Sequence, residues 1–542
     1  MNKKIAVILL VLFSAISLTL NLIGYNKIPP CFNADEAAYG YNAYSLLKTG
    51  KDEYGALLPT RLKSFEDYKL PIYSYLSIPF VKIFGLNEFS TRFLNTVIAT
   101  LFVPLIFLVA YELFANLKIG LVAGLLTSLS TWIHIMSRQA QEGVICAFLI
   151  LLATWFLIRF RKTKNHIDFF LTNLFIFLST FAYHFARIFL VFFIAYQLFL
   201  IIKNRKDHPK GGFIKDFVIK AFILIFIFII PFIIDYRYSV NRVANLVFYK
   251  NEGFGLRIKE YLVEHNQKIF HNEIFESVRD ISYRYLQQLS PDFFIIWGDK
   301  TWRFGYKHLG IITPLEYIFI FIGFYYLFKN KEKHRWLITL LFFVSPLGNA
   351  LTWQEYSLIR TYFIFFPIAV LVSYGLYHTI SQVKHNRNKY LFAFGLTVFY
   401  LFFLINNWDI YLLHYPKRIE IIRAWQCGYK EMSDYIKINY DNYDKFVITE
   451  RYGQPYIFVL FYTQYDPARY QKQAKISAPD KFGFGQIGKF DKYEFKFIFD
   501  PEAKKTVYIG YPEDFNGLAI DKSKIKKIQI RSEEIFWIYE KE

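Results

Sequence analysis

"AFILIFIFIIPFII", residues 221–234, contains no charged and no polar residue. The run "FFLTNLFIFLSTFAY", residues 169–183, is nearly as apolar. A helix that crosses the hydrocarbon core of a bilayer needs about 20 mostly apolar residues, and both runs approach that length. The chain of 542 residues is 54% hydrophobic and 21% aromatic. The sequence therefore predicts a polytopic α-helical membrane protein.

The positive charge of the chain is concentrated in short segments between the apolar runs. The formal net charge is +20, and four basic clusters lie at 159–166, 203–215, 329–335 and 384–389. Short loops rich in Lys and Arg stay on the cytoplasmic side of a membrane. We therefore attribute the charge to membrane topology and expect no nucleic-acid partner.

Placing the Lys-rich N-terminus inside puts all four basic clusters on the cytoplasmic side if the chain crosses about eleven times. The first span is expected to stay uncleaved, because no small-x-small site, as in a signal peptide, precedes "GYNKIPP". The predicted spans are about 5–24, 89–114, 118–136, 142–159, 167–184, 187–203, 215–235, 311–328, 335–350, 361–380 and 390–407. The long segments 25–88 and 236–310 and the tail from about residue 408 then lie outside.

The tail changes from apolar runs to alternating patterns typical of strands. Strands are predicted at 445–450, 495–500, 506–511, 525–530 and 534–539, after two helical stretches. We expect a membrane domain at 1–415 and a small extracytoplasmic α/β domain at 416–542, large enough for its own core. The three cysteines, Cys31, Cys146 and Cys427, form no framework. Nothing in the sequence pairs them, and free thiols are the simpler interpretation.

Two adjacent acids, Asp35 and Glu36, follow the first predicted span and open a helix-like segment. Lys69 lies further along the same outer segment, just before Pro71. One interpretation is structural: Asp35 is favoured by the helix dipole, and Lys69 extends its ammonium to the membrane surface. The other is that these charges form a site at the outer membrane face.

Charged residues also occur at three further predicted outer turns, although charges near a membrane are costly and usually have partners. They are Arg138 with Glu142, His184 with Arg187, and Glu355 with Arg360. A salt bridge between positions i and i+4 of one helix is the structural alternative for Arg138 and Glu142. Taken together, the set has the chemistry of group transfer, because a carboxylate deprotonates an acceptor hydroxyl and cations hold a phosphate leaving group.

Five stretches of the chain resemble a known family. They begin with the first-loop motif, "PPCFNADEAAYGYNAYSLLKTGKDEYG" (29–55) followed by the segment that starts at "KLPIYSY" (69–75). They continue with "SRQAQEG" (137–143), "YHFARIFL" (183–190), "LSPDFFIIWGDKTWRFGYKHLGIITPLE" (289–316) and "LTWQEYSLIRTYFIFFP" (351–367). In this order they resemble polyprenyl-phosphate-dependent glycosyltransferases of the membrane-embedded GT-C class. The similar branch includes protein O-mannosyltransferases and lipid A aminoarabinose transferases, and the resemblance runs from residue 1 to about 465.

The resemblance implies the roles of several residues. Asp35 corresponds to the catalytic base, with Glu36 beside it; Lys69 corresponds to a donor-phosphate contact, and Glu142 to the acid that follows "SRQAQ". Relatives of the aminoarabinose branch have a Glu before this Lys that can bind a metal. Tyr68 stands there in this chain, so no metal is assigned, although a divalent metal stays open. The soluble domain inserted in some eukaryotic mannosyltransferases is absent, so protein is not assured as the acceptor.

The expected function is an inverting glycosyltransferase that moves a sugar from a polyprenyl-phosphate donor to an acceptor hydroxyl at the outer membrane face. The residues expected to bind the donor phosphate are Lys69, Arg138, His184, Arg187 and Arg360. The acceptor is a glycan, a lipid or a protein. The expected location is a prokaryotic cytoplasmic membrane, with the N-terminus inside and the C-terminal domain outside.

Two other functions suit a chain of this topology. A transporter or flippase of lipid-linked sugars would commonly show internal repeats and charges at mid-membrane, whereas here the charges gather at outer turns. A ligase of polysaccharide chains onto lipid would be expected to have a different large outer loop.

Overall fold

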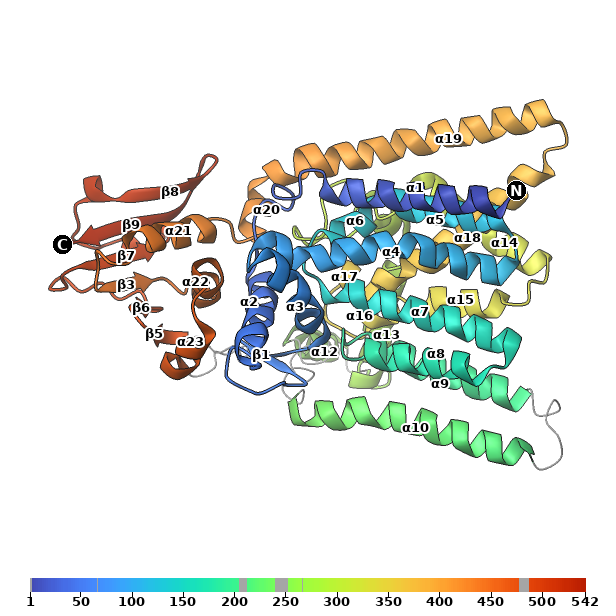
Figure 1. Cartoon of the computed structure of the whole chain (residues 1–542), viewed down its shortest axis with the longest axis horizontal. Coiled ribbons are helices and arrows are strands. Elements are labelled where there is room, and N and C mark those ends of the chain that lie inside the picture. The colour runs from blue at the N-terminus through green and yellow to red at the C-terminus, as the bar shows by residue number, and fades with distance from the viewer. Residues whose placement is uncertain (1, 66, 204–211, 239–251, 266, 477–486) are drawn as a thin grey trace. The chain divides into compact units, whose positions relative to one another are not determined.

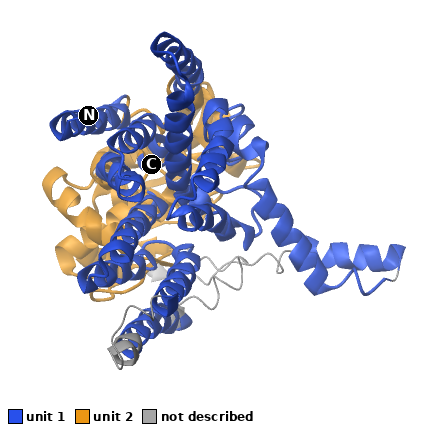
Figure 2. Cartoon of the chain, turned by 90° about the vertical axis from the view of Figure 1, so that its right-hand side faces the viewer, with its two compact units in different colours: residues 1–23, 95–137, 141–411 blue, residues 24–94, 138–140, 412–542 orange. Residues whose placement is uncertain are grey.

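The computed structural model describes residues 2–65, 67–203, 212–238, 252–265, 267–476 and 487–542. The chain forms two compact units (Figure 2). Unit 1 comprises residues 1–23, 95–137 and 141–411, and unit 2 comprises residues 24–94, 138–140 and 412–542. Each unit is described separately below.

Unit 1 is helical, and its long helices run alongside one another (Figure 1). The helices are α1 (Lys3–Leu22), α5 (Leu117–Leu129), α6 (Thr131–Ser137), α7 (Glu142–Thr163), α8 (His166–Ser179), α9 (Ala186–Lys203), α10 (Gly212–Tyr238), α12 (Glu252–Glu264), α13 (Glu273–Gln287), α14 (Pro314–Lys329), α15 (Arg335–Val344), α16 (Leu347–Ala350), α17 (Leu358–Thr361), α18 (Phe365–Gln382) and α19 (Asn386–Asp409). Helix α4 (Glu88–Phe114) begins in unit 2 and continues into unit 1. The prediction of a multi-span helical membrane protein is confirmed.

Within the described residues, six helices are long and apolar enough to cross a membrane. The pair α5 and α6, which bends by 55° at Ser130, makes a seventh if it is one span. Shorter apolar helical segments lie at Ile72–Phe84 (α3), at His166–Ser179 (α8) and at Val218–Ile234, which is part of α10. The count of eleven spans and the assignment of inner and outer loops stay predictions.

The predicted outer segment 236–310 contains helices α12 and α13 and a π-helical turn at Asp292–Ile296. Helix α13 begins at Glu273 because the Asn272 side chain accepts hydrogen bonds from the backbone N–H groups of Ile274 and Phe275, as an N-cap residue does. Residues 239–251 and 266 of this segment lie outside the described residues.

Unit 2 contains the helices α2 (Ala34–Thr49) and α3 (Ile72–Phe84) and a short hairpin of β1 (Leu62–Ser64) and β2 (Asp67–Lys69). Its remaining part is a seven-stranded mixed sheet in the order β4-β5-β6-β3-β7-β9-β8. The strands are β3 (Lys445–Ile448), β4 (Lys475–Ile476), β5 (Ile487–Phe490), β6 (Tyr493–Glu494), β7 (Thr506–Gly510), β8 (Lys526–Ile530) and β9 (Glu533–Lys541). The accompanying helices are α20 (Ile419–Ala424), α21 (Tyr429–Asn439), α22 (Pro455–Thr463) and α23 (Pro467–Gln473).

The predicted C-terminal α/β architecture is confirmed, and one predicted strand is wrong. Residues 495–500 are not in a strand; β6 ends at Glu494. The alternating apolar residues of this segment serve packing instead, because Phe497 and Phe499 pack around the buried side chains of Tyr508 and Phe515. The alternation of apolar residues at 495–500 therefore reflects contacts with the core, and these residues are not part of a strand.

The core of unit 2 joins the first long segment of the chain to its tail. The α2 residues Ala37 and Tyr41 lie in one buried cluster with Phe458 of α22, Phe446 of β3 and Phe536 of β9. The unit boundary at 411/412 lies near the boundary predicted at 415/416, but residues 24–94 belong to the same unit as the tail. Independent folding of residues 416–542 stays a prediction.

Candidate functional site

The start of α2 is fixed by a capping box. The Asn33 side chain accepts a hydrogen bond from the backbone N–H of Glu36 (3.1 Å), and the Glu36 carboxylate accepts one from the backbone N–H of Asn33 (3.3 Å). This reciprocal arrangement satisfies N–H groups that have no partner within the helix. It places Asp35 and Glu36 in the first turn, where successive side chains diverge by about 100°.

Glu36 is fully buried, and four donors surround its carboxylate. Arg92 donates from Nε to Oε1 (2.9 Å) and from Nη2 to Oε2 (2.7 Å). The backbone N–H of Ala140 donates to Oε1 (2.8 Å), and the N–H of Asn33 is the fourth donor. Arg92 also donates to the carbonyl of Cys31 (2.6 Å). The geometry gives Glu36 a supporting position, and a catalytic role for this acid stays a prediction.

Asp35 has the opposite environment. Its side chain is 43% exposed, and its Oδ1 accepts a hydrogen bond from Nζ of Lys69 at 2.7 Å. The Lys69 side chain is only 6% exposed, and its Nζ lies over the rings of Tyr39 (5.0 Å) and Phe65 (5.3 Å). Asp35 therefore presents a carboxylate to solvent beside a cation that is held in place.

Near Lys69 lies a buried acid, Glu53, for which no sequence motif predicted a role. Glu53 accepts hydrogen bonds from Tyr456 Oη (2.9 Å), Ser64 Oγ (3.1 Å) and Asn42 Nδ2 (3.1 Å). Burial raises the pKa of Glu53 from 4.5 to about 8, with a further contribution from Asp52, against the opposing effect of Lys69 and of the hydrogen bonds from Tyr456 and Ser64. The carboxyl group is therefore mostly protonated at neutral pH.

The raised pKa of Glu53 predicts a pH-dependent stability. The folded state holds a proton up to about pH 8, whereas the unfolded carboxyl releases it near 4.5. This contribution to stability is complete below pH 4.5 and is lost as the pH rises through 8. We expect Glu53→Gln, which stays neutral, to gain stability relative to wild type across this window, by at most about 1.4 kcal/mol per pH unit.

The measurement is denaturant unfolding of the two proteins in detergent between pH 5 and 9. Glu502→Gln, at an exposed glutamate of the same unit, is the matched control. Parallel pH profiles for Glu53→Gln and wild type would show that Glu53 is ionised in the folded protein.

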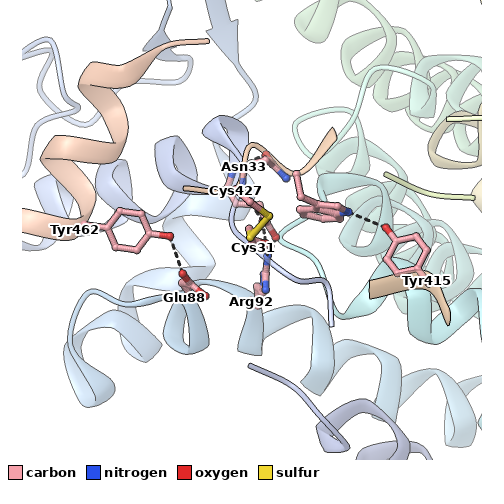
Figure 3. Close-up of a disulfide and its surroundings, with 9 residues drawn as sticks. Cys31, Asn33, Glu88, Arg92, Tyr415, Cys427 and Tyr462 are labelled. Carbon is pink, nitrogen blue, oxygen red and sulfur yellow. Dashed lines mark hydrogen bonds and ion pairs between the residues drawn. A yellow bond between two sulfur atoms is a disulfide. The ribbon is translucent and has the colours of Figure 1, made fainter. Parts of the chain in front are cut away.

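A disulfide joins the segment before α2 to the tail, so the expectation of free thiols is wrong for two cysteines. Cys31 pairs with Cys427, and Cys146 is free and buried. Beside the disulfide, Gln426 accepts a hydrogen bond from the backbone N–H of Ala34 (2.9 Å). Figure 3 shows Arg92 next to this bridge, and Glu88 bonded to Tyr462. No local pattern in the sequence indicates this pairing, because 396 positions separate the two cysteines.

Arg138 lies in a break between helices. Helix α6 ends at Ser137 and α7 begins at Glu142, so the alternative of a salt bridge along one helix is wrong for Arg138 and Glu142. The Arg138 side chain is fully buried, and its Nε donates to the carbonyl of Ile28 at 3.1 Å. Arg138 belongs to unit 2 with Gln139 and Ala140, and its buried position supports the segment that carries the Ala140 N–H.

The remaining predicted site residues belong to unit 1. Glu142 is the first residue of α7 and is half-buried. His184 lies in the turn before α9, and Arg187 lies in the first turn of that helix; both are half-buried. Their expected roles stay predictions.

Arg360 lies in the short helix α17 of unit 1. Its Nη1 donates to Thr352 Oγ1 (2.7 Å) and to Gln354 Oε1 (2.8 Å). These bonds hold the guanidinium against the turn that precedes the helix. Its expected contact with a donor phosphate stays a prediction.

Among the described residues, those around Asp35 are the cation Lys69 and the aromatic rings of Tyr39 and Phe65, and not further metal ligands. Among the residues described, no three His, Cys, Asp or Glu side chains come together as metal ligands would. Tyr68 precedes Lys69 in β2, and Glu66 lies outside the described residues. We derive no step through a metal.

Comparison with known proteins identifies the fold. Residues 69–234 match the family model described as dolichyl-phosphate-mannose-protein mannosyltransferase. The crystal structure of ArnT from Cupriavidus metallidurans bound to undecaprenyl phosphate is similar with a TM-score of 0.54 and 11% identity, over 97% of each chain. The chain has the GT-C fold. The resemblance inferred from the sequence is confirmed.

Two further comparisons agree with the GT-C fold. ArnT from the same organism in the apo state gives a TM-score of 0.51 with 10% identity, over 97% of each chain. The Archaeoglobus fulgidus oligosaccharyltransferase tethered with an acceptor peptide gives 0.50 with 12% identity, over 85% of this chain. This chain spans 63% of the length of the archaeal enzyme. None of the curated proteins matches this chain.

Proposed function

We propose that this GT-C protein transfers a sugar from a polyprenyl-phosphate donor to an acceptor hydroxyl at the outer membrane face, with inversion, and that Asp35 is the general base. The observation that carries the proposal is the pair formed by the half-exposed Asp35 carboxylate and the buried Lys69 ammonium at 2.7 Å. The donor class is supported by the family match over residues 69–234 and by a structure of similar fold bound to undecaprenyl phosphate. These matches favour transfer over transport of lipid-linked sugars.

In the proposed reaction, Asp35 accepts the proton of the acceptor hydroxyl, which must come within about 2.6–3.2 Å of the carboxylate. The hydroxyl oxygen bonds to the anomeric carbon on the face opposite the phosphate. The bond between that carbon and the phosphate oxygen breaks, and its electron pair leaves with the polyprenyl phosphate. Cations that face the departing phosphate stabilise its developing charge.

Lys69 is proposed to have two tasks in this reaction. Its ammonium positions the Asp35 carboxylate, and the same charge is available to an incoming phosphate. Glu36, saturated by Arg92 and backbone donors, is proposed to fix the first turn of α2. The donor-phosphate contacts expected of Arg138, His184, Arg187 and Arg360 from their predicted outer turns are kept as proposals. The role of Glu142, which the resemblance implies, is also kept as a proposal.

The disulfide supports the proposed orientation. Disulfides persist in oxidising compartments and are rare in the cytosol. The Cys31–Cys427 bridge therefore favours an extracytoplasmic location for unit 2, as in a prokaryotic cytoplasmic membrane with the N-terminus inside. The sugar and the acceptor (glycan, lipid or protein) are left unassigned.

Lys69→Ala tests the phosphate contact. We expect it to reduce transfer of labelled sugar from a polyprenyl-phosphate donor by about ten- to a hundredfold, because a charge-assisted hydrogen bond contributes roughly 1.5–3 kcal/mol. The assay uses membranes with matched protein levels and compares the polyprenyl-phosphate donor with a nucleotide-sugar donor.

The control is Lys51→Ala, because Lys51 is an exposed lysine of the same unit and its removal should leave transfer unchanged. Wild-type kinetics in folded Lys69→Ala would return Lys69 to a purely interfacial role. Transfer from the nucleotide sugar alone would contradict the proposed donor class.

A further inference from the structure

Unit 1 contains a pocket that the reaction proposed above does not use. Its volume is about 260 Å³, close to the lower end of small-molecule sites, about 300 Å³. It lies between α12, α13 and the turn that follows α16. Its lining includes the side chains of Phe254, Arg257, Asp280, Tyr283, Arg284, Trp353 and Glu355.

The cationic groups of this pocket are held by acids and by the backbone. Arg257 donates from Nη2 to Asp280 Oδ1 at 2.7 Å, and its Nε lies 3.4 Å from Glu276. Arg284 donates from Nε to the carbonyl of Ala350 at 3.1 Å, and its Nη1 lies 3.5 Å from Asp280. The guanidinium groups are therefore fixed in the wall.

The charges of the lining balance. Two arginines, Arg257 and Arg284, face two acids, Asp280 and Glu355. A pocket for a phosphate or another anion needs an excess of positive charge directed at the ligand, and here both arginines are paired with Asp280. The lining instead presents hydrogen-bond donors and acceptors with no net charge, which suits a neutral ligand rich in hydroxyl groups.

Two aromatic rings complete the pocket. Trp353 is 47% exposed and Tyr283 is 57% exposed. Exposed aromatic rings next to hydrogen-bonding groups suit a ligand with one apolar face and a polar rim. A sugar ring has this character, because its C–H groups form an apolar face and its hydroxyl groups point outward around the edge.

We propose that this pocket binds an uncharged sugar unit, with Trp353 and Tyr283 against the ring and the paired Arg and acid side chains at its hydroxyls. The inference rests on the lining of the pocket. It goes beyond the proposed transfer reaction and does not depend on Asp35 being the base. It places a neutral carbohydrate among the molecules that this protein recognises.

The test is calorimetric titration of the full-length protein in detergent with neutral hexose tetrasaccharides and with phosphorylated forms of the same sugars. We expect the neutral sugars to bind, and Trp353→Ala to weaken their binding at least tenfold. Trp353→Phe should retain most of the binding, because it keeps an aromatic ring. Trp336→Ala is the control, since Trp336 is another exposed tryptophan of the same unit (58%).

Each other outcome would overturn the proposal. Preference for the phosphorylated sugars would make this an anion site. If no neutral sugar binds, and lipid-borne quenchers in nanodiscs quench the fluorescence of Trp353, this part of the protein is a membrane contact. Asp35→Asn should bind the neutral sugars as wild type does, so loss of transfer and loss of sugar binding are separate results. If Trp353→Ala fails to fold, Tyr283→Ala replaces it with the same expected weakening.

Discussion

Asp35→Asn is expected to lower the rate of sugar transfer at least about a hundredfold, the scale of general base catalysis. The substitution keeps the size of the side chain and one acceptor oxygen for Lys69, whose Nζ lies 2.7 Å from Oδ1. It removes the group that accepts the proton. Because the side chain is 43% exposed, the folded protein should tolerate the change. The measurement is transfer of labelled sugar from a polyprenyl-phosphate donor in membranes with matched protein levels.

The control for this experiment is Asp434→Asn. Asp434 lies in α21 of the same unit, is 46% exposed, and is paired with Lys430 at 2.7 Å. Asp434 thus matches Asp35 in its exposure and in having a lysine partner at 2.7 Å, but Lys430 is itself exposed and Asp434 does not lie in α2. We expect transfer to be unchanged. Full activity in Asp35→Asn would leave Asp35 as a first-turn acid whose interaction with the helix dipole is worth roughly 0.3–1 kcal/mol.

The structure distinguishes the two neighbouring acids, Asp35 and Glu36. Glu36 is fully buried among Arg92 and backbone donors, so its carboxylate is directed at the supporting structure and Asp35 at the solvent. Adjacent side chains on a helix are expected to point in different directions, and in the structure Asp35 and Glu36 do so. The two acids are thus distinguished by burial, which their sequence positions do not show.

The membrane class and the tail architecture were predictable because they depend on local composition and periodicity. Apolar runs such as 187–203, in α9, indicate spans wherever they occur, and the strands β3, β7, β8 and β9 follow the alternating patterns of the tail. The start of α2 was also readable. The number of spans was harder to predict, because helices such as α8 are shorter than a full membrane crossing. Length alone does not decide whether such a helix crosses the membrane.

The remaining features depend on contacts between distant positions. Glu53 meets Tyr456 from 403 positions away, and Cys31 meets Cys427. No local pattern encodes either pairing. Arg92 did carry a signal, because a charge at the start of an apolar helix is costly and usually has a partner. That signal pointed to a partner without indicating that the partner was Glu36.

Arg92→Met is expected to destabilise the protein by about 3–5 kcal/mol, the cost of leaving one member of a buried ion pair without its partner. Arg92 and Glu36 are both almost fully inaccessible, with side chains 2% and 0% exposed. The substitution leaves the Glu36 carboxylate with only backbone donors and removes the bond to the Cys31 carbonyl. The measurement is denaturant unfolding in detergent, and Lys430→Met, which removes an exposed pair, should cost less than about 1 kcal/mol.

The double variant Glu36→Gln/Arg92→Met identifies the cause of the loss. If an uncompensated buried charge is responsible, neutralising Glu36 should recover at least about 1 kcal/mol of the loss, the scale of coupling between residues in contact. If the loss came only from packing around Phe32 and Trp425, whose rings lie beside the Arg92 guanidinium, the double variant should be no more stable than Arg92→Met. Transfer activity supplies a second readout, because the same pair fixes the turn that presents Asp35. An Arg92→Met protein with wild-type stability and wild-type transfer would remove Arg92 and Glu36 from any supporting role.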